Sequence, residues 1–267
     1  MIHCPICNGS LDVAFVAQVL CRHRATYDYC HDCGFLRARN PHWLDEAYSS
    51  AIASTDTGVV MRNIDVARKL IKIYLGVLGE QGHGRYCDMG GGYGMLTRLM
   101  RDYGFDYYWS DKHCDNLMAR GFEYTPELGP CSAVTAIEIM EHLEDPLRFV
   151  SEAMERTKAR AFIFTTELFE GTPPAPSEWW YYSFEMGQHI AFFQKRTLER
   201  MAEKLGLFFV SVQGVHIYSL EPIKSWRLKL ALGRFGNLLT RNARRRLVGR
   251  VMSDHQQLRQ LVISEGR

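Results

Sequence analysis

The residues with the most recognisable chemistry in this sequence are two closely spaced pairs of cysteines. Cys4 and Cys7 form one C-x-x-C pair, and Cys30 and Cys33 form a second. Each pair can present two thiolates to one metal ion, and together they complete the tetrahedral four-thiolate site that zinc prefers. Such a closed site leaves no position for water, so we expect a structural zinc ion that does no chemistry.

A second chemical motif is a glycine-rich segment that begins after a short predicted strand at residues 85–89. It has the form D-x-G-x-G-x-G, in which glycine lets the chain turn sharply and lets backbone N–H groups approach a ligand. Asp111 ends the next predicted strand, 105–110, about where a Rossmann-type unit places its ribose-binding acid. The candidate ligand-binding residues of this turn are Asp88, Gly90, Gly91, Gly92 and Gly94.

The spacing of the last two glycines argues against a dinucleotide. In the dinucleotide motif two residues separate the second and third glycines, and a pyrophosphate sits on the following helix N-terminus. Here a single residue, Tyr93, separates Gly92 from Gly94. A nicotinamide cofactor is therefore disfavoured.

The elements that must position these residues alternate between helix and strand signals. Apolar residues at helical spacing predict a helix over 60–78, and Asp145 with Pro146 predicts the start of another helix. Further strands are expected at 133–139 and 161–165, and a helix over 197–205 precedes two strands, 207–213 and 215–220. The alternation predicts an α/β domain.

The chain divides by composition into four parts. Residues 1–40 are too few to fold on apolar burial alone, which a structural metal would compensate. Residues 41–58 are expected to form a connector, 59–220 a catalytic domain and 221–267 a basic tail. Nine basic residues and no acid lie between Ile223 and Arg250, although the net charge of the whole chain is only +2.

From about Val60 to Leu220 the order of motifs resembles the class I methyltransferases that use S-adenosylmethionine. The motifs are the acidic glycine-rich turn, Asp111 and the segment Glu138-Ile-Met-Glu-His-Leu-Glu-Asp-Pro146. The resemblance implies a Rossmann-like, mostly parallel seven-stranded sheet with a C-terminal antiparallel hairpin. It also implies that the turn, Asp111 and Glu138 bind S-adenosylmethionine. Cys131-Ser132 lacks the aspartate often found there, which leaves adenine recognition unassigned.

More narrowly, the chain resembles bacterial sugar C- and O-methyltransferases that carry an N-terminal zinc domain, and methyltransferases of polysaccharide biosynthesis. This resemblance implies His189 and His142 as catalytic candidates, because methyl transfer to a hydroxyl needs a base. A packing role for either histidine stays open. The candidate substrate-binding residues are Glu167, Trp179, Tyr181 and Tyr182. The alternatives are that Glu167 is a solvated loop carboxylate and that the aromatic residues pack in the core.

The C-terminal tail interleaves apolar and basic residues. This pattern is typical of a segment that binds an anionic membrane surface. It is equally typical of a helix that packs against the catalytic domain or against a second subunit. The N-terminus has no secretory pattern and no apolar run is long enough to span a bilayer, so we expect a cytoplasmic protein, peripheral at most on the inner face of the membrane.

The function predicted from the sequence is O-methylation of a sugar hydroxyl in a nucleotide-linked, lipid-linked or polysaccharide acceptor. Sugar C-methylation is one alternative. An RNA methyltransferase that uses the zinc module and tail is another, although the tail has no stacking motif and nucleic acid is disfavoured as a partner. The third is a non-catalytic adaptor that keeps the fold.

Overall fold

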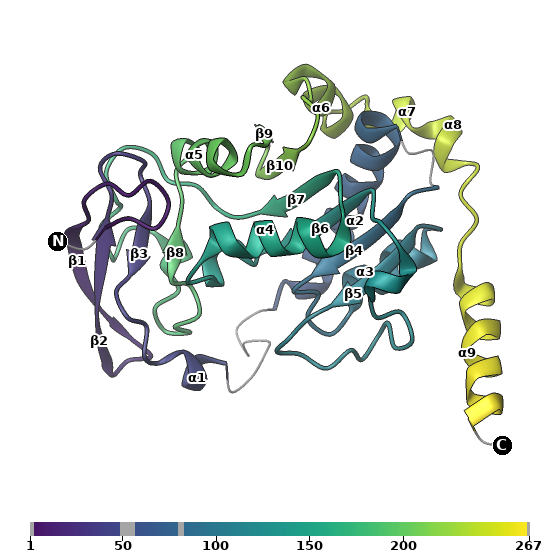
Figure 1. Ribbon diagram of the computed structural model, residues 1–267, viewed down its shortest axis with the longest axis horizontal. Helices are drawn as coiled ribbons and strands as arrows, with labels where there is room; N and C mark the ends of the chain where they lie inside the picture. Colours follow the sequence, from purple (N-terminus) through teal and green to yellow (C-terminus); the bar gives the residue numbers. More distant parts are fainter. Residues whose placement is uncertain (1–2, 49–56, 80–82, 266–267) are drawn as a thin grey trace. The chain divides into compact units, whose positions relative to one another are not determined.

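The computed structural model describes residues 3–48, 57–79 and 83–265 (Figure 1). Its internal contacts separate two compact units. Unit 1 contains Met1–Ser54, Ala136–Glu155 and Ala161–Pro222, and unit 2 contains Thr55–Thr135, Arg156–Arg160 and Ile223–Arg267. The two units are described separately below.

The larger sheet confirms the α/β fold class. Among the described residues it has six strands in the order β5-β4-β6-β7-β10-β9. Strand β4 pairs in parallel with β5 and β6, whereas β10 pairs antiparallel with β7 and β9, which gives the expected C-terminal hairpin. The strands are β4 (Arg85–Met89), β5 (Asp106–Ser110), β6 (Ala133–Ile137), β7 (Ala161–Thr165), β9 (Phe208–Val212) and β10 (Val215–Ser219).

We expected seven strands in this sheet. At the edge beyond β5, where a further strand would pair, there is an isolated β-bridge instead. Glu123 forms an isolated parallel bridge with Trp109 of β5, supported by a hydrogen bond from the Tyr124 N–H to the Trp109 carbonyl. Two residues later Pro126 begins the 3-10 helix η2 (Pro126–Leu128). Because proline has no N–H to donate to a ladder, the pairing ends there.

The helices begin and end close to the expected positions. Helix α2 (Val59–Ile73) continues into the π-helical turn η1 (Tyr74–Leu78), and α3 (Met95–Asp102) follows the glycine turn. Helix α4 (Pro146–Thr157) starts after Asp145, whose carboxylate accepts the Arg148 N–H at 3.0 Å as an N-cap does. Helix α5 (Lys195–Leu205) ends at Gly206, which has left-handed φ.

Unit 1 contains a second, four-stranded sheet in the order β1-β2-β3-β8. Strands β1 (Asp12–Val19), β2 (His23–Tyr29) and β3 (Leu36–Ala38) come from the N-terminal module, but β8 (Ala191–Phe192) follows from far along the chain and pairs with β3 (Figure 1). The short helix α1 (Leu44–Ala47) falls within the expected connector, of which residues 49–56 lie outside the described part. The N-terminal module therefore completes its sheet with a strand from the region we assigned to the catalytic domain.

The tail forms four helices: α6 (Ser225–Leu232), α7 (Gly236–Leu239), α8 (Arg241–Arg244) and α9 (Val251–Glu265). Leu228 and Ala231 of α6 are buried, and α6 contacts α2 within unit 2. Trp226, Leu238 and several apolar residues of α9 are exposed. No helix in the described part of the chain is long and apolar enough to cross a membrane.

Helix α9 is fixed to unit 2 by a buried ion pair. Asp254 accepts two hydrogen bonds from Arg101, at 2.7 and 2.8 Å, and another from Arg98. Both Asp254 and Arg101 are almost fully buried. Burial opposes ionisation of Asp254, but the bonds from Arg101 and Arg98 outweigh it and hold its pKa below the ordinary value.

Replacing Asp254 with asparagine is expected to destabilise the protein by about 3 kcal/mol, because the buried Arg101 would keep only its longer ion pair with Asp106, at 3.6 Å. Urea denaturation at neutral pH measures the loss. The depressed pKa makes the contribution of Asp254 fully present above about pH 4 and lost at lower pH, so the difference should shrink on acidification. Asp102→Asn is the control, since this exposed partner of Arg98 should contribute less than about 1 kcal/mol.

Candidate functional site

The four cysteines of the two pairs converge in unit 1. One sulfur from each lies within 4.8 Å of the others, with 3.6 Å between Cys4 and Cys33 and 3.4 Å between Cys7 and Cys30. Four sulfurs at zinc–sulfur bonds of about 2.3 Å would stand about 3.8 Å apart, so the observed cluster fits a zinc ion. The Gly9 N–H donates to the Cys7 sulfur at 3.4 Å, as backbone amides around metal thiolates do. This geometry is compatible with the predicted structural zinc.

The glycine-rich turn of unit 2 is closed by Asp111. The Gly92 N–H donates to one carboxylate oxygen of Asp111 at 2.9 Å, and the N–H groups of His113 and Cys114 donate to the other at 2.7 and 3.0 Å. Trp109 donates its indole N–H to the Gly92 carbonyl at 2.7 Å. The first motif and the acid of the second strand are therefore one hydrogen-bonded unit, and their binding of S-adenosylmethionine stays a prediction.

Glycine is required at two positions of this turn for different reasons. Gly92 has a φ of 51°, which favours glycine, and no heavy atom lies within 4 Å of the place where a side chain would project. A Cβ at Gly91 would lie 2.8 Å from the Trp109 ring, which shows that the turn packs tightly on its inner side. The turn is therefore closely packed at Gly91 and open at Gly92.

Asp88 lies beneath the turn and is almost fully buried. Its carboxylate accepts a hydrogen bond of 2.7 Å from the Thr135 hydroxyl, which in turn accepts one of 2.8 Å from Tyr107. Burial raises the pKa of Asp88 to about 7 despite the bond from Thr135, and the charge of Asp111 adds to the rise. Asp88 is therefore partly protonated at neutral pH until a cation neutralises it.

The other predicted acid, Glu138, lies in unit 1 together with both candidate histidines. It ends β6 with a left-handed φ of 54°, and Thr165 of β7 donates its hydroxyl to the Glu138 carboxylate at 2.6 Å. The Glu138 N–H donates to the same Thr165 oxygen at 3.1 Å. This strained backbone turns the chain into η3 (Met140–His142).

His142 and His189 meet in this unit with Glu141. One donor atom of each residue lies within 4.8 Å of the other two, and the imidazole centroids are 4.9 Å apart. Nδ1 of His142 lies 3.1 Å from the Gln188 carbonyl, and Nδ1 of His189 lies 2.6 Å from the Tyr181 carbonyl. The structure thus brings together both catalytic candidates and an acid that we had not selected.

The two carbonyls favour the same tautomer in both rings. A carbonyl oxygen only accepts, so an Nδ1 that bonds to it carries the proton and leaves a lone pair on Nε2. Nδ1 of His142 also lies 3.1 Å from the Tyr48 hydroxyl, whose oxygen can accept from the same N–H. Burial, together with the neighbouring His189, lowers the pKa of His142 to about 3, and burial also lowers that of His189. Both rings are therefore neutral at physiological pH.

Glu141 is fully buried, and neither of its carboxylate oxygens has a hydrogen-bond partner in the described part of the chain. The nearby hydroxyls of Tyr181 and Thr166 lie 3.2 Å from each other and form their own bond. Burial raises the pKa of Glu141 to about 8, and the charge of Glu138 adds to the rise. An acid in this setting is a functional candidate in its own right.

The predicted substrate-binding residues differ in how far they are buried. Glu167 is exposed and Trp179 is partly buried, whereas Tyr181 and Tyr182 are buried. Tyr182 belongs to the hydrophobic core of unit 1 and donates its hydroxyl to the Pro174 carbonyl at 2.8 Å, so it packs and anchors instead of offering a sugar platform. Among the aromatics of this segment, Trp180 is the exposed one, at 78%.

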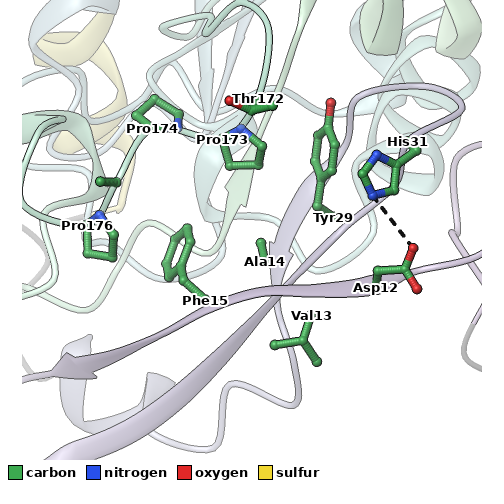
Figure 2. Close-up of a pocket in the computed structure, with 11 residues that line it drawn as sticks. Asp12, Val13, Ala14, Phe15, Tyr29, His31, Thr172, Pro173, Pro174 and Pro176 are labelled. Carbon is green, nitrogen blue, oxygen red and sulfur yellow. Dashed lines mark ion pairs between the residues drawn. The ribbon is translucent and has the colours of Figure 1, made fainter.

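The proline-rich approach to this segment borders a surface pocket of about 410 Å³ in unit 1 (Figure 2). Strands β1 and β2 form one wall and residues 172–176 form the other. None of the predicted site residues lines this pocket. Two hydrogen bonds fasten this loop, from the Tyr182 hydroxyl to the Pro174 carbonyl and from the Gln194 side chain to the Gly171 carbonyl at 2.7 Å.

Two polar residues of the candidate sites, Glu141 and Thr135, were not predicted from the sequence. Glu141 precedes His142 directly and was part of the motif that we quoted, but its burial cannot be read from an exposed-looking polar run. Thr135 lies in the apolar strand β6, where a threonine reads as an ordinary β-former. The available signal for Thr135 was a polar side chain within an apolar strand. For Glu141 it was only its place in the polar segment that follows the same strand.

Comparison with known proteins identifies the protein family to which this chain belongs. A family model described as "Methyltransferase domain" matches residues 62–212, which is more than half of the chain. The chain therefore belongs to this methyltransferase family. No curated protein matches it.

Several solved structures are similar to this chain at low sequence identity. Magnesium protoporphyrin IX methyltransferase from Synechocystis PCC 6803 with bound SAH has a TM-score of 0.42 and 14% identity, over 66% of this chain and 91% of that one. TnmH has a TM-score of 0.41 and 16% identity, over 68% and 62%. An O-methyltransferase family 2 protein from Planctomyces limnophilus, in complex with apigenin, has 0.38 and 11%, over 65% and 63%.

Proposed function

We propose that this chain transfers a methyl group from S-adenosylmethionine to a hydroxyl of a sugar or glycan acceptor. The observation that carries the proposal is the closed glycine turn. In it the Asp111 carboxylate accepts the Gly92 N–H and still has a lone pair that can accept a hydrogen bond from a ligand. The match to the methyltransferase family supports the reaction class. The choice of a sugar acceptor rests on the resemblance of the zinc module and of the His189 segment to sugar methyltransferases.

The residues of the turn would hold the donor. The donor, when bound, supplies an electrophilic methyl group on a sulfonium. The open side of Gly92 would admit its nucleoside, the free lone pair of Asp111 would accept a hydrogen bond from one ribose hydroxyl, and the buried carboxylate of Asp88 would balance positive charge. Each of these roles uses a group that the fold has already oriented, which lowers the entropic cost of binding.

The residues after β6 would act on the acceptor. A hydroxyl loses its proton as it attacks the methyl carbon, so an acceptor of that proton, or a cation that stabilises the alkoxide, is needed. His142 and His189 each present an Nε2 lone pair, and their Nδ1 bonds hold the rings in place. Either ring can therefore orient the hydroxyl through Nε2.

Calorimetry with S-adenosylmethionine and with its demethylated product tests the donor. We expect one binding site for each, and the absence of heat with both would refute the enzymatic assignment. Incubation with nucleotide sugars and glycan termini, followed by mass analysis for a gain of one methyl group, tests the acceptor. Methylation of RNA but of no carbohydrate would replace the sugar assignment.

The buried Asp88 predicts a pH dependence of donor binding. With a pKa of about 7 in the free protein, Asp88 must lose its proton to balance the cationic donor. Affinity should therefore rise about tenfold from pH 6 to pH 8, and Asp88→Asn should flatten the profile. Without ligand the raised pKa has the opposite effect on stability, because the fold should lose stability as pH rises from about 4 to about 7. A pH-independent affinity for the unsubstituted protein would contradict this role.

A further inference from the structure

We propose that Glu141, His142 and His189 form a second metal site, for a divalent first-row transition ion and separate from the four-cysteine zinc site. The three residues supply one carboxylate and two neutral imidazoles from one compact unit, with donor atoms within 4.8 Å of one another. Two histidines and one carboxylate are a recurrent ligand set for such ions, and they leave coordination positions open.

The strongest argument is the Glu141 carboxylate. A buried carboxyl group without a hydrogen-bond partner is costly to ionise, so it keeps its proton until a counter-charge reaches it. Neither carboxylate oxygen of Glu141 has a hydrogen-bond partner in the described part of the chain, and the charged neighbour that acts on its pKa is another acid, Glu138. A cation bound beside the two histidines would replace that proton and balance the charge of Glu141.

The histidines are oriented as metal ligands usually are. In protein metal sites the ring nitrogen that does not bind the ion donates to a carbonyl or a carboxylate, which fixes the ring. His142 and His189 each direct Nδ1 to a backbone carbonyl, of Gln188 and of Tyr181 respectively. The described residues form no hydrogen bond to either Nε2, so these atoms are available to an ion.

The backbone around the cluster holds the two segments together. The Ile190 N–H donates to the Glu141 carbonyl at 2.8 Å, and the Ile190 carbonyl accepts from the Ala38 N–H of β3 at 2.8 Å. His189 is therefore tied both to Glu141 and to the N-terminal sheet. Metal bonds of about 2.1 Å would bring the donor atoms to within about 4.2 Å of one another, which small side-chain rotations achieve.

The two sites differ in the range of ions that they can bind. Thiolates are soft ligands that select zinc, whereas a site of imidazoles and a carboxylate also accepts the harder Mn²⁺. Under the proposed function, an ion at this site would polarise an acceptor hydroxyl through an open coordination position. That extension rests on the proposed function, but binding of the ion does not.

Mn²⁺ titration of the zinc-loaded full chain, followed by the electron paramagnetic resonance signal of free Mn²⁺, tests the site. We expect one Mn²⁺ per chain while zinc stays at one equivalent by metal analysis. Glu141→Gln and His189→Asn should each weaken Mn²⁺ binding at least about tenfold. Asparagine keeps an N–H donor for the Tyr181 carbonyl, and the exposed His42→Ala controls for the loss of a histidine.

Calorimetry with S-adenosylmethionine on the same variants separates this inference from the proposed function. A variant that binds the donor normally but has lost Mn²⁺ is folded and supports the site. An unsubstituted protein that binds the donor but no Mn²⁺ overturns the metal site and leaves the proposed function standing. Equal Mn²⁺ affinity in the unsubstituted protein and both variants also overturns it.

Discussion

Replacing Cys30 with serine is expected to abolish zinc binding and unfold the N-terminal sheet. Four thiolates share the ion, and in small zinc domains the binding free energy, about 10 kcal/mol or more, supplies most of the folding free energy. Strands β1 to β3 hold too little core to stay folded without it. Metal analysis should give well below one zinc per chain, and limited proteolysis should cleave within residues 10–40.

Cys21→Ser is the matched control, because Cys21 is exposed, lies in the same module and is outside the cluster. It should keep one zinc and the proteolysis pattern of the unsubstituted chain. The effect of Cys30→Ser should also reach His189, since β3 pairs with β8 and bonds Ile190. Full zinc content in Cys30→Ser would show that the four cysteines are not the ligands.

Asp111→Ala is expected to lower donor affinity about 100-fold. Three N–H groups already donate to Asp111, so its remaining lone pair can accept one ribose hydroxyl. Loss of one charge-assisted hydrogen bond of up to about 3 kcal/mol corresponds to about two powers of ten. Asp111→Asn keeps one acceptor oxygen and should lose about tenfold. Calorimetry with the demethylated product measures both, and it avoids turnover.

Asp115→Asn provides the control for charge, because Asp115 is an exposed acid four residues along in the same loop. Its affinity should stay within about twofold of the unsubstituted protein. Since Asp111 also accepts from Gly92, His113 and Cys114, the thermal stability of each variant must be compared. Normal donor affinity in a folded Asp111→Ala variant would limit Asp111 to closing the turn.

The tertiary structure also changes which parts of the sequence act together. We assigned residues 1–40 to a zinc-binding module, and the sheet of this module also takes β8 from residues 191–192. Thr197 at the start of α5 donates its hydroxyl to the Cys33 carbonyl at 2.8 Å, which ties the zinc site to the same region. The module therefore supports the His189 segment, a role that its cysteine spacing does not reveal.

The sequence by itself determined the features that depend on neighbouring residues. The C-x-x-C spacing, the glycine turn, the start of α4 at Asp145 and the end of α5 at Gly206 follow from local backbone geometry, which a few residue types satisfy. The tight turn of the final hairpin is of the same kind, since Gln213 and Gly214 both adopt positive φ there.

Only the tertiary structure decided the features that depend on distant residues and on burial. Glu141 meets His189, 48 positions along the chain, and Arg101 pairs with Asp254, 153 positions away. Such contacts form because packing closes long loops and removes water from particular polar groups, and no local pattern specifies which groups those are. A residue's type and spacing indicate what it can bind, but its burial and partners decide whether it does.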